Sequence, residues 1–163
     1  MILYFLRHGR AEQHSEGPDA ERRLTKKGTH ELEGAGPLWR RLKLRPEVIL
    51  SSPLVRAVQT AEIARAELEL KAKLQTDERL APGASWDRMA QAMADHHEAA
   101  RVMFVGHNPD FEDAVELLSG AEAVRIRPGG VACLEFPGVP EPRAGEIAWL
   151  LDPDLYVKEG DSA

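Results

Sequence analysis

The sequence predicts an α/β protein: one three-layer α/β/α domain with a mostly parallel sheet and an antiparallel C-terminal hairpin. Apolar runs of strand length at 1–6, 48–50 and 102–105 alternate with longer segments of helical pattern. Strands that alternate with helices are typical of a parallel sheet covered on both faces. Two later apolar runs, 131–136 and 147–151, flank a bend rich in Pro and Gly, which predicts the hairpin.

The N-terminal third begins with a buried strand at 1–6, followed by a polar loop over residues 8–23. Thr25 is placed to cap a helix that runs to about Leu42. Three glycines and Pro37 lie inside this helix, so we expect it to be weak or kinked. After the strand at 48–50, Ser51, Ser52 and Pro53 open a further helix, with Pro53 suited to its first turn.

The middle of the chain is less regular, with a short strand expected near 70–74 and a turn at Pro82-Gly83. Ser85 is expected to cap a helix that runs to about His97. After the strand at 102–105, Asn108-Pro109 begins a helix that ends near Leu118.

Size and composition indicate a single domain over residues 1–163 in a reducing cytoplasm. The 163 residues suffice to bury one core, and 43% of them are hydrophobic. The single cysteine, Cys133, has no partner for an internal disulfide, and we expect it to face the core. The apolar opening stops at Arg7 after six residues, so we expect neither a targeting segment nor a membrane span.

The net charge of −6 is unevenly distributed along the chain. Residues 1–80 carry 15 Lys and Arg against 12 Asp and Glu, whereas residues 81–163 carry 6 against 15. The basic residues of the first half are scattered and interleaved with Glu, which favours a solvated surface over a nucleic-acid interface.

Three segments place a basic or imidazole side chain just after a predicted strand. They are Arg7-His8-Gly9, Ser52-Pro53 with Arg56, and Gly106-His107-Asn108-Pro109. Because the carboxyl ends of parallel strands meet at one edge of the sheet, two arginines and two histidines are expected to meet there. Two helix N-termini point their free N–H groups toward the same edge, which favours an anion such as phosphate.

Other phosphate chemistries do not fit the sequence. No GxxxxGK[ST] segment exists, and Val139 stands where a thiol phosphatase would need an arginine six residues after Cys133. Asp152-Pro153-Asp154 follows the last strand, which argues against a catalytic carboxylate pair. The six histidines have no metal-ligand spacing, so we expect no metal and no cofactor; His96-His97 fits a solvated helix end.

These motifs resemble those of the histidine phosphatase superfamily, also called the phosphoglycerate mutase-like family. The resemblance rests on Arg7-His8-Gly9, on the segment Ser52-Pro53-Leu54-Val55-Arg56-Ala57-Val58-Gln59-Thr60 and on Gly106-His107-Asn108, in this order. It spans nearly the whole chain and implies the phosphoglycerate mutase-like fold. The stretch Asp19-x-x-Arg22-x-Leu24-Thr25-x-x-Gly28 and the small size are similar to the SixA-type phosphohistidine phosphatases.

The resemblance implies a role for each motif residue. His8 would attack phosphorus as a neutral imidazole and become phosphohistidine, which water then hydrolyses. Arg7 and Arg56 would hold the phosphoryl oxygens, and their charge would disfavour protonation of His8. His107 would be a second imidazole that donates to the same oxygens.

For one further pair of residues two roles remain open. Asp19 and Arg22 fit a loop salt bridge as well as substrate contacts. Gln59 and Thr60 are expected to pack the helix behind Arg56.

One departure from the family pattern bears on the substrate. Larger members that act on phosphate esters carry a general-acid Glu after a segment that resembles Arg79-Leu80, and Ala81-Pro82 stands there in this chain. An alkoxide needs a proton in order to leave, whereas imidazole has a conjugate acid near neutrality. The missing acid therefore favours phosphohistidine, with Glu12, Asp77 and Glu78 as alternative proton donors.

The sequence thus predicts a monomeric, metal-independent cytoplasmic phosphatase acting on a phosphohistidine-bearing partner protein in signal transduction, with no nucleic acid or membrane as partner. One alternative is the same chemistry on a small phosphate ester or anhydride. Another is a catalytically silent module that binds phosphorylated partners. The silent module is disfavoured because His8 and all three phosphate ligands are present.

Overall fold

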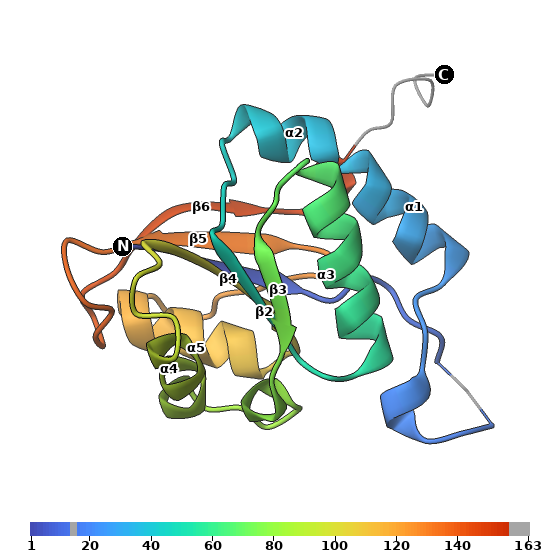
Figure 1. Ribbon diagram of the computed structural model, residues 1–163, viewed down its shortest axis with the longest axis horizontal. Coiled ribbons are helices and arrows are strands. Elements are labelled where there is room, and N and C mark those ends of the chain that lie inside the picture. The colour runs from blue at the N-terminus through green and yellow to red at the C-terminus, as the bar shows by residue number, and fades with distance from the viewer. Residues whose placement is uncertain (14–15, 157–163) are drawn as a thin grey trace.

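A single sheet forms the middle layer of the computed structural model, which describes residues 1–13 and 16–156 (Figure 1). Within these residues six strands pair in the order β3-β2-β4-β1-β5-β6. The strands are β1 (Ile2–Arg7), β2 (Val48–Ser51), β3 (Lys73–Thr76), β4 (Arg101–Gly106), β5 (Val131–Glu135) and β6 (Glu146–Leu151). The first four are parallel, and β5 and β6 form the antiparallel end. The predicted fold class is confirmed.

Helices cover both faces of this sheet (Figure 1). On one face lie α1 (Lys26–Gly34), α2 (Gly36–Arg41) and α3 (Val55–Glu67), and on the other lie α4 (Trp86–Ala94) and α5 (Asp110–Ser119). Three short 3₁₀ helices lie in the connections, η1 (Asp19–Glu21), η2 (Glu78–Leu80) and η3 (Pro153–Leu155).

The apolar core is divided by the sheet into two halves. Along β1, Leu3 and Phe5 pack with α4 and α5, whereas Tyr4 and Leu6 pack with α1, α2 and α3. A strand buried on both faces needs apolar side chains at every position, which explains the uninterrupted run at the start of the sequence. Trp39 and Cys133 are buried in the second half, and the expected core position of Cys133 is confirmed.

The register of the central strands brings the three sequence motifs to one edge. Arg7 of β1 pairs with Gly106 of β4, and Ser51 of β2 pairs with Val105 of β4. The ladder continues one residue further, since the amide of His8 donates to the carbonyl of Gly106.

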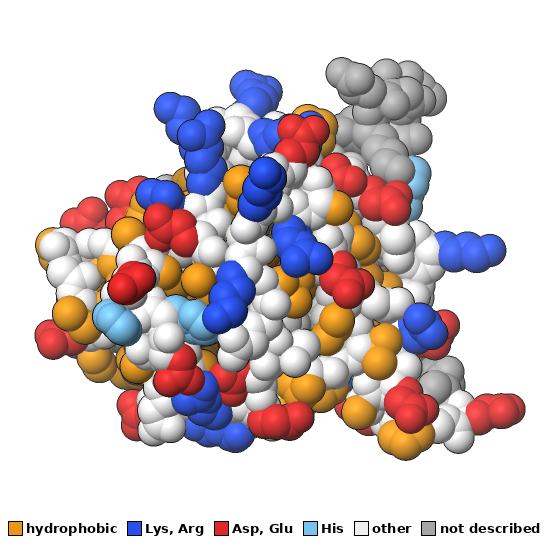
Figure 2. All heavy atoms as spheres, viewed as in Figure 1, with side chains coloured by type: hydrophobic (Ala, Val, Ile, Leu, Met, Phe, Trp, Pro, Cys, Tyr) orange, Lys and Arg blue, Asp and Glu red, His pale blue; other side chains and the backbone are white. Residues whose placement is uncertain are grey.

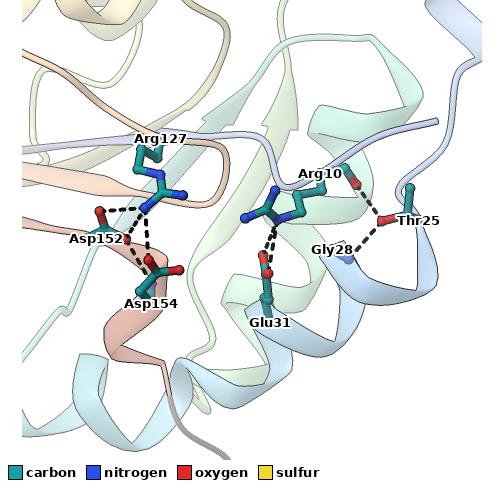
Figure 3. Close-up of polar contacts among 7 residues, drawn as sticks. All are labelled: Arg10, Thr25, Gly28, Glu31, Arg127, Asp152 and Asp154. Atoms are coloured by element: carbon teal, nitrogen blue, oxygen red, sulfur yellow. Dashed lines mark hydrogen bonds and ion pairs between the residues drawn. The ribbon is translucent and has the colours of Figure 1, made fainter. Parts of the chain in front are cut away.

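The predicted helix from Thr25 to Leu42 is two helices, which is a correction to the sequence reading. Thr25 caps the first as expected, because its hydroxyl accepts the amide of Gly28 at 2.9 Å (Figure 3). The break falls at Ala35, and α2 then begins at Gly36, with Pro37 in its first turn, where it supplies no N–H for the preceding turn. Gly28 allows α1 to lie against the strand-exit loop, since a Cβ there would collide with the backbone of Arg10.

Three other element boundaries differ from the sequence prediction. α3 begins at Val55, so Pro53 precedes the helix and is not in its first turn. The edge strand β3 starts at Lys73, about three residues later than expected, where it pairs with β2. Ser85 caps α4 as predicted, but the helix ends at Ala94 before His97 is reached.

The surface seen in Figure 2 mixes Lys and Arg side chains with Asp and Glu side chains over the same elements. No continuous basic stripe crosses this face. Among the described residues, no helix is both long and apolar enough to span a bilayer.

Candidate active site

A pocket of about 740 Å³ lies where the carboxyl ends of β1, β2 and β4 meet. Its lining includes Arg7, His8, Arg56 and His107, the four residues singled out from the sequence. The rings of His8 and His107 have centroids 5.2 Å apart, and Arg56 Nε lies 3.4 Å from His8 Nε2. The structure thus brings all four predicted residues together, and we call them the phosphoryl clamp.

The hydrogen bonding of His8 determines which ring nitrogen is free. Its Nδ1 lies 2.8 Å from the carbonyl oxygen of Gly9. Because a carbonyl only accepts, we assign the ring proton to Nδ1, which leaves the lone pair on Nε2. Burial, reinforced by the charges of Arg56 and Arg7, lowers the pKa of His8 to about 4. The ring is therefore neutral at pH 7, as the sequence analysis expected.

His107 follows β4 and is buried, with 4% of its surface exposed. Its Nε2 lies 2.7 Å from the hydroxyl oxygen of Ser52, and that oxygen accepts the amide of Leu54 at 3.3 Å. Among the described residues the Ser52 hydroxyl has no other acceptor for its hydrogen, so we assign that hydrogen to His107 Nε2, which places the ring proton on Nδ1. Burial, with the charges of His8 and Arg56 adding to it, lowers the pKa of His107 to about 3.

Arg56 stands in the first turn of α3, with 4% of its surface exposed. Its Nη1 donates to the backbone oxygen of Asp19 at 2.9 Å, and its Nη2 donates to the Asp19 carboxylate at 3.2 Å. One turn later, the hydroxyl of Thr60 donates to the carbonyl of Arg56 and accepts the amide of Gly9 at 3.1 Å. Thr60 thus ties the helix that carries Arg56 to the backbone beside His8.

Sequence reasoning missed this function of Thr60 and its neighbour. Gln59 and Thr60 were expected only to pack behind Arg56, yet the side-chain oxygen of Gln59 accepts the amide of Leu24 at 2.8 Å. Both residues therefore join α3 to the loop between β1 and α1. The one available signal was their position three and four residues after Arg56, on the same side of the helix.

Arg7 is held from the other side, by the loop that precedes β5. Its Nη1 donates to the carbonyl of Ile126 at 2.9 Å, and burial lowers its pKa, with the carboxylate of Glu112 acting in the opposite direction. Its Nε is buried without a hydrogen-bond partner among the described residues. The amide of Gly129 donates to the carbonyls of both Arg7 and His8, at 3.1 and 3.0 Å. Gly129 has a φ of +83°, a conformation that glycine adopts without strain.

Asp19 and Arg22, which the sequence left open, both line the pocket and contact each other. Arg22 Nε donates to the Asp19 carboxylate at 2.7 Å, so this carboxylate bridges Arg22 and Arg56. Slight burial acts to raise the pKa of Asp19, but the hydrogen bonds from Arg22 and Arg56 outweigh it and the pKa is lowered. The salt bridge expected as one alternative therefore exists, and it lies at the mouth of the phosphoryl clamp.

The other acidic candidates lie elsewhere. Asp19 is the single carboxylate in the pocket lining that the structure describes, and Glu12, Asp77 and Glu78 are not part of it. The carboxylate of Asp77 binds Arg79, while Pro82 lines the pocket.

The remaining sequence candidates take no part in the pocket. Asp152 and Asp154 bind Arg127 (Figure 3), and His96-His97 lie in the turn after α4. Within residues 1–13 and 16–156, no cluster of three metal-ligating side chains occurs.

Comparison with known proteins assigns a family to this arrangement. Two arginines and two neutral imidazoles meet at the carboxyl edge of this α/β sheet, where positive charge and hydrogen-bond donors suit an anion. Residues 3–125 match the histidine phosphatase superfamily, branch 1. The chain belongs to this superfamily.

One sequence relative and two solved structures are similar to most of the chain. An uncharacterized protein of Picosynechococcus sp. (strain ATCC 27264 / PCC 7002 / PR-6) is 37% identical over 126 residues, 73% of each chain. A crystal structure assigned to phosphohistidine phosphatase SixA of Agrobacterium tumefaciens is 25% identical, with a TM-score of 0.80 over 93% of this chain and 97% of that one. The structure of the protein histidine phosphatase SixA in complex with tungstate is 25% identical, with a TM-score of 0.81, and the match covers 94% of this chain and 98% of that one.

A more distant structure shares the fold alone. The alpha-ribazole phosphatase of Shigella flexneri has a TM-score of 0.73 at 14% identity, covering 98% of this chain and 100% of that chain.

Proposed function

We propose that the protein is a phosphatase that removes the phosphoryl group from phosphohistidine on a partner protein, with His8 as the covalent nucleophile. The observation that carries this proposal is the contact of His8 Nδ1 with the Gly9 carbonyl, which leaves Nε2 with its lone pair beside Arg56 in the pocket. The likeness to SixA supports the choice of substrate. In this proposal the enzyme acts as a monomeric single domain in the cytoplasm, in signal transduction and without a metal.

In the first step His8 Nε2 attacks phosphorus, and the bond between phosphorus and the substrate's imidazole nitrogen breaks. The substrate reacts with the second nitrogen of its ring protonated from solvent, so the electron pair of the broken bond goes to the departing nitrogen and the imidazole leaves as a neutral molecule. Arg7, Arg56 and the Nδ1–H of His107 bind the three equatorial oxygens while negative charge accumulates on them. Loss of one such preorganised donor commonly lowers the rate about 100-fold to 1,000-fold.

In the second step water attacks the phosphohistidine formed on His8. The phosphorus–nitrogen bond breaks, its electron pair returns to Nε2, and dihydrogen phosphate leaves with the oxygen and both hydrogens of the water. His8 regains the neutral ring with Nδ1 bonded to the Gly9 carbonyl. The low pKa of His8 favours this step, because a weakly basic nitrogen is a good leaving group.

The lining of the pocket supports phosphohistidine as the substrate. Pro82, which with Ala81 stands where ester-cleaving relatives are expected to carry a general acid, lines the pocket. Asp19 is the one carboxylate in the described lining, and its lowered pKa keeps it ionised at pH 7, so it has no proton to donate. An alkoxide leaving group would find no acid there, whereas imidazole leaves with little help.

The test compares substrates and variants in one assay. The protein is incubated with a phosphohistidine-bearing phosphotransfer domain and with a panel of phosphate esters and anhydrides, each with and without a chelator. His8→Ala and His8→Gln serve as nucleophile variants, and His97→Gln, outside the pocket, serves as a matched control. We expect turnover of the phosphotransfer domain by the wild type and by His97→Gln, with no effect of the chelator.

Each part of the proposal has its own contrary result. Turnover of esters alone would exclude phosphohistidine as the substrate. Loss of activity with the chelator would exclude the metal-independent mechanism, and full activity of His8→Ala would exclude His8 as the nucleophile. Trapping should yield a phosphoenzyme that is labile in acid and stable in alkali in the wild type and in His97→Gln, but in neither His8 variant.

A further inference from the structure

The pocket extends well beyond the phosphoryl clamp. Its volume of about 740 Å³ is in the range of clefts that hold whole small molecules, far more than one phosphoryl group fills. Toward α1 it is lined by Arg10, Gln13, Thr25 and Lys27, which we call the α1 side of the pocket. The group that carries the phosphoryl, or its neighbours, must therefore lie against this part of the lining.

The α1 side is positively charged, and its charges are incompletely paired. Arg10 donates through Nε to both carboxylate oxygens of Glu31, at 3.0 and 3.1 Å, which leaves its two terminal nitrogens without partners in the described structure (Figure 3). Lys27 is exposed and makes no hydrogen bond or ion pair with any described residue. Glu31 therefore orients the Arg10 side chain through Nε alone. The two terminal nitrogens of the Arg10 guanidinium, which can bind an anion in bidentate fashion, are left available.

Arg127 provides a contrast within the same region of the molecule. Its Nη1 donates to Asp152 at 3.1 Å and to Asp154 at 2.9 Å, so two carboxylates neutralise one guanidinium (Figure 3). The lining of the pocket has the opposite balance, with five Lys and Arg side chains against the carboxylate of Asp19. A phosphoryl group brings about two negative charges, so the lining retains positive charge after it binds.

We propose that Arg10 and Lys27 form a second anion-binding subsite, which takes a carboxylate side chain of the partner protein next to its phosphohistidine. This inference rests on the proposed function and names a property of its substrate. A carboxylate is the anion that a protein surface supplies, and the fork of Arg10 suits it. Because the chain as a whole carries a charge of −6, this local subsite also offsets the repulsion that an acidic partner meets at longer range.

The experiment uses two phosphohistidine peptides that differ only at the positions around the phosphohistidine, with Asp and Glu in one and Asn and Gln in the other. The wild type is expected to show the lower KM for the acidic peptide. Lys27→Ala should raise the ratio of the KM for the acidic peptide to the KM for the neutral peptide about threefold to fivefold over the wild type. The kcat for each peptide should stay at its wild-type value. The double variant Arg10→Gln, Glu31→Gln removes the other cation together with its internal partner and should act in the same direction.

Lys26→Ala is the matched control, because Lys26 is an exposed neighbour of Lys27 that does not line the pocket. It removes the same charge and should leave the ratio of the two KM values as in the wild type. Inorganic phosphate, as an inhibitor that occupies the clamp alone, should show a similar inhibition constant for wild type and Lys27→Ala.

Three results would overturn the subsite. Equal KM values of the two peptides for the wild type would exclude it while leaving the proposed function intact. An equal effect of Lys26→Ala and Lys27→Ala would replace it with general electrostatic attraction. Turnover of phosphate esters without turnover of either peptide would refute the proposed function, and the peptide subsite with it.

Discussion

His107 Nε2 lies 2.7 Å from Ser52 Oγ, and this buried contact joins the ends of β4 and β2. With no other acceptor for its hydrogen among the described residues, the hydroxyl is assigned as the donor to the imidazole. Under the proposed function Ser52 is therefore a positioning residue, because it fixes which nitrogen of His107 carries the ring proton.

Ser52→Ala tests this relationship. Without the hydroxyl, either ring nitrogen of His107 can carry the proton. We therefore expect kcat to fall about 10-fold to 100-fold, as is typical when a residue that orients a functional side chain is removed. Ser51→Ala is the control, because Ser51 is equally buried and its hydroxyl donates only to the carbonyl of Ser52. Nitrogen NMR of the His107 ring should show a changed tautomer in Ser52→Ala alone. An unchanged tautomer with full activity would contradict the assignment.

The pocket histidines, His107 buried and His8 half-buried, predict how stability depends on pH. Their folded-state pKa values are about 4 for His8 and about 3 for His107, below the unfolded value of about 6.5. At a pH between the folded-state and unfolded-state pKa values, the unfolded chain binds more protons than the folded chain. The free energy of unfolding therefore falls as the pH is lowered from about 6.5 toward 4. The slope is about 1.4 kcal/mol per pH unit for each histidine.

Denaturant unfolding at a series of pH values measures this slope. His8→Gln should reduce the decrease between pH 6.5 and 4 by about half, because one of the two titrating groups is gone. The same decrease in the wild type and in His8→Gln would show that His8 is not buried as a neutral ring.

Thr60 provides a test with a conservative control. Thr60→Val removes the hydroxyl that accepts the amide of Gly9 and donates to the carbonyl of Arg56. Leaving a buried amide without a partner costs about 1–3 kcal/mol, and we expect that decrease in the free energy of unfolding. Activity should decrease as well, since Gly9 and Arg56 flank the nucleophile, whereas Thr60→Ser should restore both properties. Wild-type stability and activity in Thr60→Val would refute this role.

Tyr156 bonds the loop whose Gly129 contacts the carbonyls of Arg7 and His8. Its hydroxyl donates to the carbonyl of Gly129 at 2.9 Å and accepts Trp39 Nε1 at 3.3 Å. Tyr156→Phe keeps the ring and should lower the free energy of unfolding by about 1–3 kcal/mol, because two buried polar groups lose a partner. Activity should change less than threefold, since the amide of Gly129 still bonds the carbonyls of Arg7 and His8. Thermal unfolding and a steady-state assay together check both expectations.

The gathering of the clamp was predictable from the sequence for a geometric reason. Arg7, His8 and His107 each stand at or just after the end of an apolar strand, and the ends of parallel strands meet at one edge. Arg56 required one further step, the first turn of the helix after β2. Strand and helix order were enough to place all four without any knowledge of side-chain packing.

The supporting contacts were not predictable, because they depend on how elements pack in three dimensions. Thr60 reaches the amide of Gly9 only because α3 lies against the loop after β1. The hydrogen bonds from Arg22 and Arg56 to the Asp19 carboxylate depend on the position of η1 relative to α3. The start of β3 at Lys73 is set by its register with β2, since polar edge residues carry a weak strand signal.

The position of β4 has a consequence for how the protein acquires its site during folding. β4 lies between β1 and β2 in the sheet, although it follows both in the chain. A nascent or truncated chain that ends before Arg101 therefore lacks the strand that sets His8 beside Arg56, however well its own helices form. Under the proposed function, phosphate affinity is expected only once the sheet is complete, so an anion in the pocket would favour the finished fold over every shorter or partly assembled form.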